Sequence, residues 1–99
     1  MSELLEKQTN KQAVKPPKLW SIIFVNDDFT TFEFVMFCLT NIFNKTEEQA
    51  FAITKDIHEK GKGVVGQYTK EIVETKQQMA IELARQNDHP LHVVIEEAP

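Results

Sequence analysis

The sequence predicts an α/β (α+β) fold, a small β-α-α-β-α-β sandwich in which a three-stranded antiparallel sheet carries three helices on one face. The chain has 99 residues, 41% of them hydrophobic, which is enough for one domain with a single modest core. Short runs of β-branched and aromatic residues alternate with segments whose apolar residues recur at helical spacing. We therefore expect one core domain over residues 18–99, preceded by a flexible extension over residues 1–17.

Three segments have the composition of strands. Residues 19–25, with the sequence LWSIIFV, are rich in aromatic and β-branched side chains and stop abruptly at the turn formers Asn26, Asp27 and Asp28. Two later stretches, 64–68 and 91–95, are shorter runs of the same kind. We expect the three strands to form one sheet.

Two helices are predicted from the spacing of a capping box, in which a Thr precedes a Glu or Gln by three residues. Thr30 and Glu33 have this spacing before a helix expected over residues 31–43. Thr46 and Gln49 repeat it before the second helix. The apolar residues that follow each box recur at helical intervals, which supports both predictions.

The second helix is expected to end near His58, with Gly61 able to adopt the left-handed conformation that closes a helix. Thr69 can cap the third helix, which should end before the polar turn at residues 86–90. One face of the third helix is predicted to hold Ile72, Lys76, Met79, Ala80 and Leu83.

Charge is distributed unevenly along the chain, whose net charge is −4. Four lysines against two glutamates give residues 1–18 a net charge of +2, which leaves −6 for residues 19–99. An acidic body binds a phosphate backbone poorly, so we expect no nucleic-acid partner. The longest apolar run is far shorter than the roughly 20 residues of a membrane span. The sequence therefore predicts a soluble cytosolic protein with no membrane partner.

Motifs for catalysis or metal binding are weak. Cys38 is the only cysteine and lies among apolar helical residues, where a buried, inert thiol is the ordinary explanation. His89 and His92 flank a proline without the spacing of a metal site. Neither Ser2 nor Ser21 lies in a nucleophile elbow. We therefore expect no enzyme activity, no metal and no cofactor.

The turn of Asn26, Asp27 and Asp28 concentrates hydrogen-bond acceptors at the end of a strand. Such a set suits an ammonium group with its three donors. A plain turn is the more ordinary explanation, since Asn and Asp bond to their own backbone. His58 has two interpretations as well: an exposed imidazole favoured by a helix C-terminus, or a partner facing the acidic turn. Spacing alone leaves these alternatives open.

An ordered set of motifs resembles the ClpS family of protease adaptors. The resemblance covers about residues 15–96, and its parts keep the same order with similar gaps. The motifs are Lys15-Pro16-Pro17, Val25-Asn26-Asp27-Asp28-Phe29-Thr30, Glu33-Phe34-Val35, His58 with Gly61, the sequence EIVETK at residues 71–76, and His89-Pro90-Leu91.

This resemblance implies an adaptor that binds the free N-terminal residue of N-degron substrates in the bacterial cytosol. It would deliver them to the ClpA unfoldase of the ClpAP protease and so modulate substrate choice. Asn26, Asp28 and His58 would contact the substrate α-amino group, and Asp27 would add to the negative electrostatic potential around it. A Leu, Phe, Tyr or Trp side chain would enter a hydrophobic pocket. The pocket residues implied are Phe32, Val35, Thr54, Ile57 and Leu91.

The resemblance also implies partners. Glu71 and Lys76 match positions that face the N-terminal domain of a ClpA-type AAA+ unfoldase, and the adaptor is expected to be a monomer. Phe32 and Thr54 depart from the family, which commonly has Met at both positions. The rigid ring of Phe32 and the smaller, more polar side chain of Thr54 are expected to affect which N-terminal residues the pocket prefers. The preference between Leu and Ile is affected in particular.

Two other function classes compete with an adaptor. One is a small scaffold or ribosome-associated protein-interaction domain that uses the same fold without an N-terminus pocket. The other is a small metal-dependent enzyme. A peptide with a free N-terminal Phe and its acetylated twin separate these classes, because only the adaptor distinguishes the two peptides.

Overall fold

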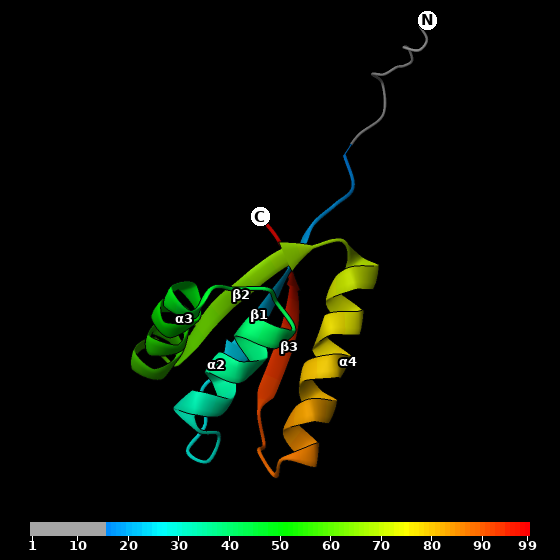
Figure 1. Ribbon diagram of the computed structural model, residues 1–99. Helices are drawn as coiled ribbons and strands as arrows, with labels where there is room; N and C mark the ends of the chain where they lie inside the picture. The colour runs from blue at the N-terminus through cyan, green and yellow to red at the C-terminus, as the bar shows by residue number, and fades with distance from the viewer. Residues whose placement is uncertain (1–15) are drawn as a thin grey trace, which may run out of the picture.

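Three strands and three helices make up residues 16–99, the part of the chain that the computed structural model describes (Figure 1). The elements in chain order are β1 (Trp20–Val25), α2 (Phe32–Asn41), α3 (Glu47–Lys60), β2 (Lys62–Tyr68), α4 (Lys70–Gln86) and β3 (His92–Glu97). This is the predicted β-α-α-β-α-β order. The predicted extension falls on residues 1–17, of which 1–15 lie outside the described residues.

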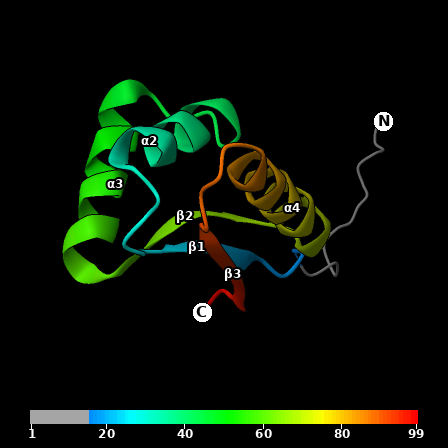
Figure 2. The ribbon, with the colours of Figure 1, turned by 90° about the horizontal axis from the view of Figure 1, so that it is seen from below.

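The sheet has β1 at its centre, in the order β2-β1-β3, and both neighbours run antiparallel to it. Figure 2 shows all three helices on the same face of this sheet, so the predicted fold class is confirmed. Ile22 and Phe24 of β1 are fully buried. Ile23, which points to the opposite face, is also only 5% exposed, so the apolar run of this central strand is buried on both sides. No helix among residues 16–99 is long and apolar enough to cross a membrane.

The start of α2 differs from the capping box predicted at Thr30 and Glu33. Thr31 is the N-cap, and its hydroxyl accepts a hydrogen bond from the Phe34 N–H at 3.1 Å. The Thr30 hydroxyl instead donates to Asp27 at 2.7 Å. The prediction was wrong by one residue because two threonines compete for the cap, and the charged acceptor of Asp27 engages the first of them.

The start and end of α3 agree with the prediction. Thr46 and Gln49 form a reciprocal capping box, with bonds of 3.1 and 3.0 Å. Gly61 closes the helix at φ 93°, where its N–H donates to the Ile57 carbonyl at 3.0 Å. A side chain at this φ is strained, which explains the glycine. The helix runs to Lys60, two residues beyond the predicted end at His58.

The buried face of α4 includes Ala80 from the predicted face but leaves Ile72 and Met79 outside it. Val73, Ala80 and Ala84 are buried against the sheet, whereas Ile72 and Met79 are 44% and 47% exposed. The small alanines let the helix lie close to the strands, and this close packing decides the face over the larger side chains. Thr69 is the N-cap, although its side chain makes no capping hydrogen bond.

Cys38 lies in the core of α2 and is fully buried. Burial raises the pKa of its thiol to about 12. The thiol therefore stays protonated at neutral pH, which agrees with the inert cysteine expected from the sequence. Among residues 16–99 no three potential metal-ligating side chains come together.

Candidate functional site

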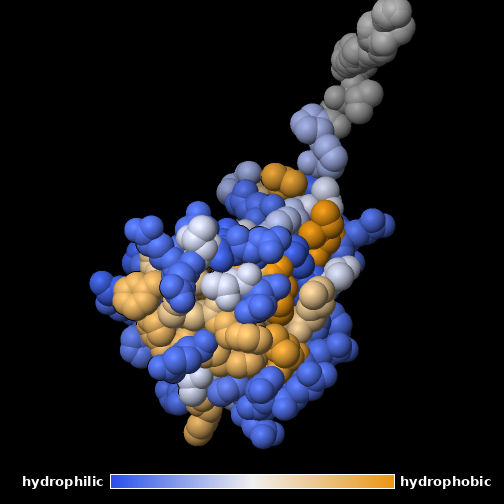
Figure 3. All heavy atoms as spheres, in the orientation of Figure 1, coloured by the Kyte–Doolittle hydropathy of each residue, from blue (hydrophilic) through white to orange (hydrophobic). Residues whose placement is uncertain are grey.

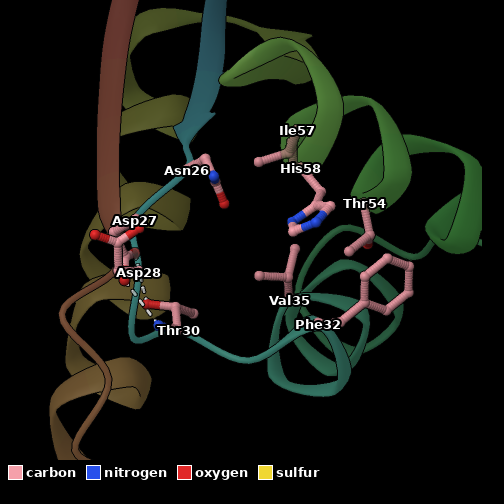
Figure 4. A pocket seen from close by; sticks show the side chains of 9 residues that line it. All are labelled: Asn26, Asp27, Asp28, Thr30, Phe32, Val35, Thr54, Ile57 and His58. Atoms are coloured by element: carbon pink, nitrogen blue, oxygen red, sulfur yellow. Dashed lines mark hydrogen bonds between the residues drawn. The ribbon is translucent and has the colours of Figure 1, made fainter.

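A cavity of about 390 Å³ opens between the loop that follows β1, the first turns of α2 and one face of α3 (Figure 4). Its volume lies within the range of roughly 300–1,000 Å³ that is usual for small-ligand pockets. The residues that line it are Asn26, Asp27, Asp28, Thr30, Phe32, Val35, Thr54, Ile57 and His58. All four residues predicted to bind an amino group, and four of the five predicted pocket residues, are therefore brought together.

A backbone hydrogen bond joins the end of β1 to the end of α3. The Asn26 N–H donates to the Gly61 carbonyl at 2.8 Å, next to the register pair of Val25 and Lys62. His58 lies in the last turn of α3, just before the Gly61 cap. The Asn26 and His58 side chains consequently point toward each other across the cavity (Figure 4). Of the two interpretations of His58, the geometry favours the one in which it faces the acidic turn.

The Asp27 carboxylate organises the loop. One oxygen accepts the Phe29 and Thr30 N–H groups at 2.8 and 2.7 Å, and the other accepts the Thr30 hydroxyl at 2.7 Å. Burial alone would raise the pKa of Asp27, but these hydrogen bonds and nearby His92 outweigh it and lower the pKa. The sequence did not assign Thr30 to the site, although it lines the cavity and donates to Asp27. The available signal was Asp27 itself, because Asp side chains in turns bond to backbone N–H groups just ahead of them.

Asp28 differs from Asp27 because its carboxylate is exposed and forms no hydrogen bond or ion pair with any other residue of the range 16–99. A carboxylate in this state keeps its acceptor positions available for a ligand. Asp27 holds the loop in shape, and Asp28 offers the free charge at the rim of the cavity.

The deeper wall of the cavity is apolar. Val35 and Ile57 are buried, and Thr54 is only 3% exposed. The Thr54 hydroxyl donates to the Ala50 carbonyl at 2.7 Å, so its polar group is already satisfied inside α3. Phe32 is half-buried and lies where the cavity meets solvent. The site thus combines a rim rich in hydrogen-bond acceptors with an apolar interior.

Removing the Asp27 carboxylate should destabilise the fold. We expect Asp27→Ala to lower the free energy of unfolding by about 1–2 kcal/mol at pH 7, because three donors lose their acceptor. The pKa of Asp27 is lower in the folded state than in the unfolded state. The stabilisation by its carboxylate is therefore fully present at pH values above the ordinary Asp pKa, and it is lost as the pH falls through the folded-state pKa. Urea unfolding at several pH values measures the difference from the wild type, which should shrink below about pH 4.

Asp28→Ala is the control for this measurement, because its carboxylate accepts no hydrogen bond within residues 16–99. Its free energy of unfolding should stay within about 0.5 kcal/mol of the wild type. Equal destabilisation in the two variants, or a difference that does not change with pH, would contradict the role assigned to Asp27.

Comparison with known proteins decides the family. The model of the family described as "ATP-dependent Clp protease adaptor protein ClpS" matches residues 15–94. The chain belongs to the ClpS family. Members of this family are adaptors of the Clp protease rather than enzymes, so the expectation of an adaptor without enzyme activity is confirmed. An adaptor of this kind interacts with Clp protease components and with substrates.

Individual ClpS proteins match most of the chain. The Neisseria gonorrhoeae ATP-dependent Clp protease adapter protein ClpS is 45% identical over 82 residues, 83% of this chain and 79% of that protein. The Paraburkholderia phymatum protein of the same name is 43% identical over 95 residues, 96% of this chain and 89% of that protein. The solved structure of Agrobacterium tumefaciens ClpS2 bound to L-phenylalaninamide is 31% identical, with a TM-score of 0.80, and covers 84% of this chain and 100% of that one.

Three residues singled out through the ClpS resemblance lie away from the cavity. Leu91 does not line it; the side chain is buried in the core, just before β3. Glu71 is exposed in the first turn of α4. Lys76 is half-buried, and its ammonium group donates to the Ile42 carbonyl at the end of α2 at 2.6 Å. This bond caps a helix whose last turn carries no basic residue of its own.

Proposed function

We propose that this chain binds the free N-terminal residue of N-degron substrates, with Leu, Phe, Tyr or Trp in first position, and delivers them to the ClpA unfoldase of the ClpAP protease. The observation that carries the proposal is the cavity itself, with acceptors at its rim and an apolar interior. An N-terminal residue has the same two parts, an ammonium group and a side chain. The proposed binder acts as a monomer in the bacterial cytoplasm.

The rim recognises the ammonium group in this proposal. An α-amino group has a pKa of about 7.7–8.0, so most of it is charged at pH 7. Asn26, Asp28 and His58 line the cavity into which such a group would fit. Asn26 and His58 face each other across it (Figure 4). Acetylation, or burial of the nitrogen in a peptide bond, removes the charge and two donors. The rim would therefore select true N-termini over internal residues.

The interior accepts the side chain. An aromatic side chain has roughly 150–250 Å² to bury, which at about 25 cal/mol/Å² stabilises the complex by about 4–6 kcal/mol. Association costs an estimated 4–15 kcal/mol, so a small site of two parts should bind at micromolar rather than nanomolar strength. Such affinity suits an adaptor that must release its substrate to the protease.

The relative of known structure supports the same chemistry. Agrobacterium tumefaciens ClpS2 is bound to L-phenylalaninamide, a single residue with a free α-amino group and an aromatic side chain. That ligand carries both parts of the proposed substrate, with a carboxamide where the rest of a peptide would follow. This chain shares the fold of ClpS2 and offers a cavity of matching chemical character.

Docking on the unfoldase would use α4, which lies on the other side of α2 from α3 in both ribbon views (Figures 1 and 2). Substrate could therefore remain bound while α4 contacts the unfoldase. Glu71 is exposed and free to contact a partner, whereas the Lys76 ammonium already bonds to the Ile42 carbonyl. We propose Glu71 as the main docking charge, and the extension over residues 1–17 as a delivery segment.

Degradation of a reporter tests the proposal. A folded reporter that begins with Phe should be degraded by reconstituted ClpAP several-fold faster when this chain is added. The same reporter with an acetylated N-terminus should gain nothing, because the ammonium group is absent. Acceleration of both reporters, or of neither, would contradict recognition of the N-terminus and would favour a scaffold without such a pocket.

A further inference from the structure

Phe51 is an exposed aromatic residue that does not itself line the cavity but contacts a residue that does. Its side chain is 52% exposed on α3. The ring packs against the ring of Phe32, with centroids 5.5 Å apart and planes inclined at 59°. Tilted aromatic pairs at this separation are attractive beyond the area that they bury. Phe51 therefore reaches the cavity through Phe32.

The position of Phe51 on α3 places it beside the cavity. Thr54 and His58, which line the cavity, follow Phe51 by three and seven residues. Residues at this spacing lie on one face of a helix. The face of α3 that forms the wall thus extends by one further turn to Phe51. Figure 3 shows apolar side chains at the surface over α2 and α3, surrounded by hydrophilic ones.

Phe32 is the part of the wall that most needs support. Val35, Thr54 and Ile57 are buried and held by the core, whereas Phe32 is half-buried in the first turn of α2. A partly exposed ring without a neighbour exchanges between rotamers. Contact with the Phe51 ring restricts this exchange and keeps Phe32 at the mouth of the cavity.

We propose that Phe51 is a positioning residue that sets the selectivity of the cavity between aromatic and β-branched N-terminal side chains by fixing the ring of Phe32. This inference rests on the proposed function. Ile and Val carry two heavy atoms on Cβ, close to the backbone, where the mouth of the cavity is. A fixed ring at the mouth excludes that extra branch but admits a planar side chain with one substituent on Cβ. A mobile ring yields to both.

A binding series tests this role. Fluorescence anisotropy would give dissociation constants for peptides that differ only in a first residue of Phe, Ile or acetylated Phe. Because an aromatic pair is worth about a 2- to 13-fold change in an equilibrium constant, Phe51→Ala should reduce the Phe-over-Ile preference by about 3- to 10-fold. Phe51→Tyr keeps an aromatic ring and should retain the wild-type preference.

Phe37→Ala is the matched control. Phe37 is also a helical phenylalanine, is 49% exposed and packs on another ring, that of Phe34, but it does not contact the cavity. Its loss should leave the preference unchanged. The inference is overturned if Phe51→Ala keeps the wild-type preference, or if Phe37→Ala lowers it equally. If wild-type protein binds free and acetylated Phe peptides equally, the proposed function fails, and this inference with it.

Discussion

Replacing Asp28 with Asn will weaken the binding of a peptide with a free N-terminal Phe by about 10- to 150-fold. The carboxylate of Asp28 is exposed at the rim of the cavity and has no partner among residues 16–99. A hydrogen bond to a charged group is worth about 1.5–3 kcal/mol, which gives this range. Asn keeps one acceptor oxygen, but it loses the negative charge and gains two donors that face the ammonium group unfavourably. Anisotropy titration measures the loss, and thermal unfolding should show no change in Tm, because no internal bond is broken.

Asp56→Asn is the control for Asp28→Asn. Asp56 carries the same charge on α3 and pairs with Lys60 at 3.7 Å, but it does not line the cavity. Asp56 is two residues from both Thr54 and His58, so it projects from another side of α3. Because its exposed charge is screened by solvent and salt, we expect less than a roughly twofold change in affinity. A loss of similar size in both variants would assign the effect to general charge and would remove Asp28 from the site.

The second large effect is expected from the peptide. A peptide that begins with Ala should bind about 10- to 150-fold more weakly than one that begins with Phe. On side-chain transfer scales, burial of a large apolar side chain contributes about 1.5–3 kcal/mol, below the upper value of about 4–6 kcal/mol that complete burial of the aromatic area gives. A methyl group leaves Val35, Thr54 and Ile57 without contacts. Titration of both peptides in one buffer measures the ratio. Equal affinities would show that the amino group is bound without its side chain.

Binding should require the free amino group whether the peptide begins with Phe or with Ala. Acetylation of the Phe peptide is expected to abolish binding, and raising the pH above about 8 should weaken binding as the α-amino group loses its proton. An affinity that is constant from pH 7 to 9.5 would contradict recognition of the ammonium form.

The local features of the fold could be predicted because their causes are local. The LWSIIFV run and the turn after it predict β1, and the Thr46 and Gln49 box predicts the start of α3. The site could be predicted only in parts. Asn26 and His58 are far apart in sequence, and what brings them together is the antiparallel pairing of β1 with β2 and the bond from Asn26 to Gly61. Only the ClpS resemblance indicated that they share a site.

The errors have physical causes of their own. The sequence grouped Ile72 and Met79 with Ala80 on one face of α4. Close packing on the sheet instead buries Ala80 together with Ala84 and leaves the two larger side chains exposed. The exposed Phe51 gave no signal of a role in the sequence. It became visible only as the neighbour of Phe32 in space.

The most direct test of the account is a heteronuclear NMR titration with L-phenylalaninamide and N-acetyl-L-phenylalaninamide. If the cavity binds a free N-terminal residue, the free-amine compound will shift the amide signals around the cavity and the acetylated compound will leave them in place. The largest shifts are expected at Asn26, Asp28, Thr54 and His58. The groove lined by Ile42, Met79, Glu82, Leu83 and Gln86 serves as an internal control. Shifts at that groove instead of the cavity, or equal shifts with both compounds, would contradict the account.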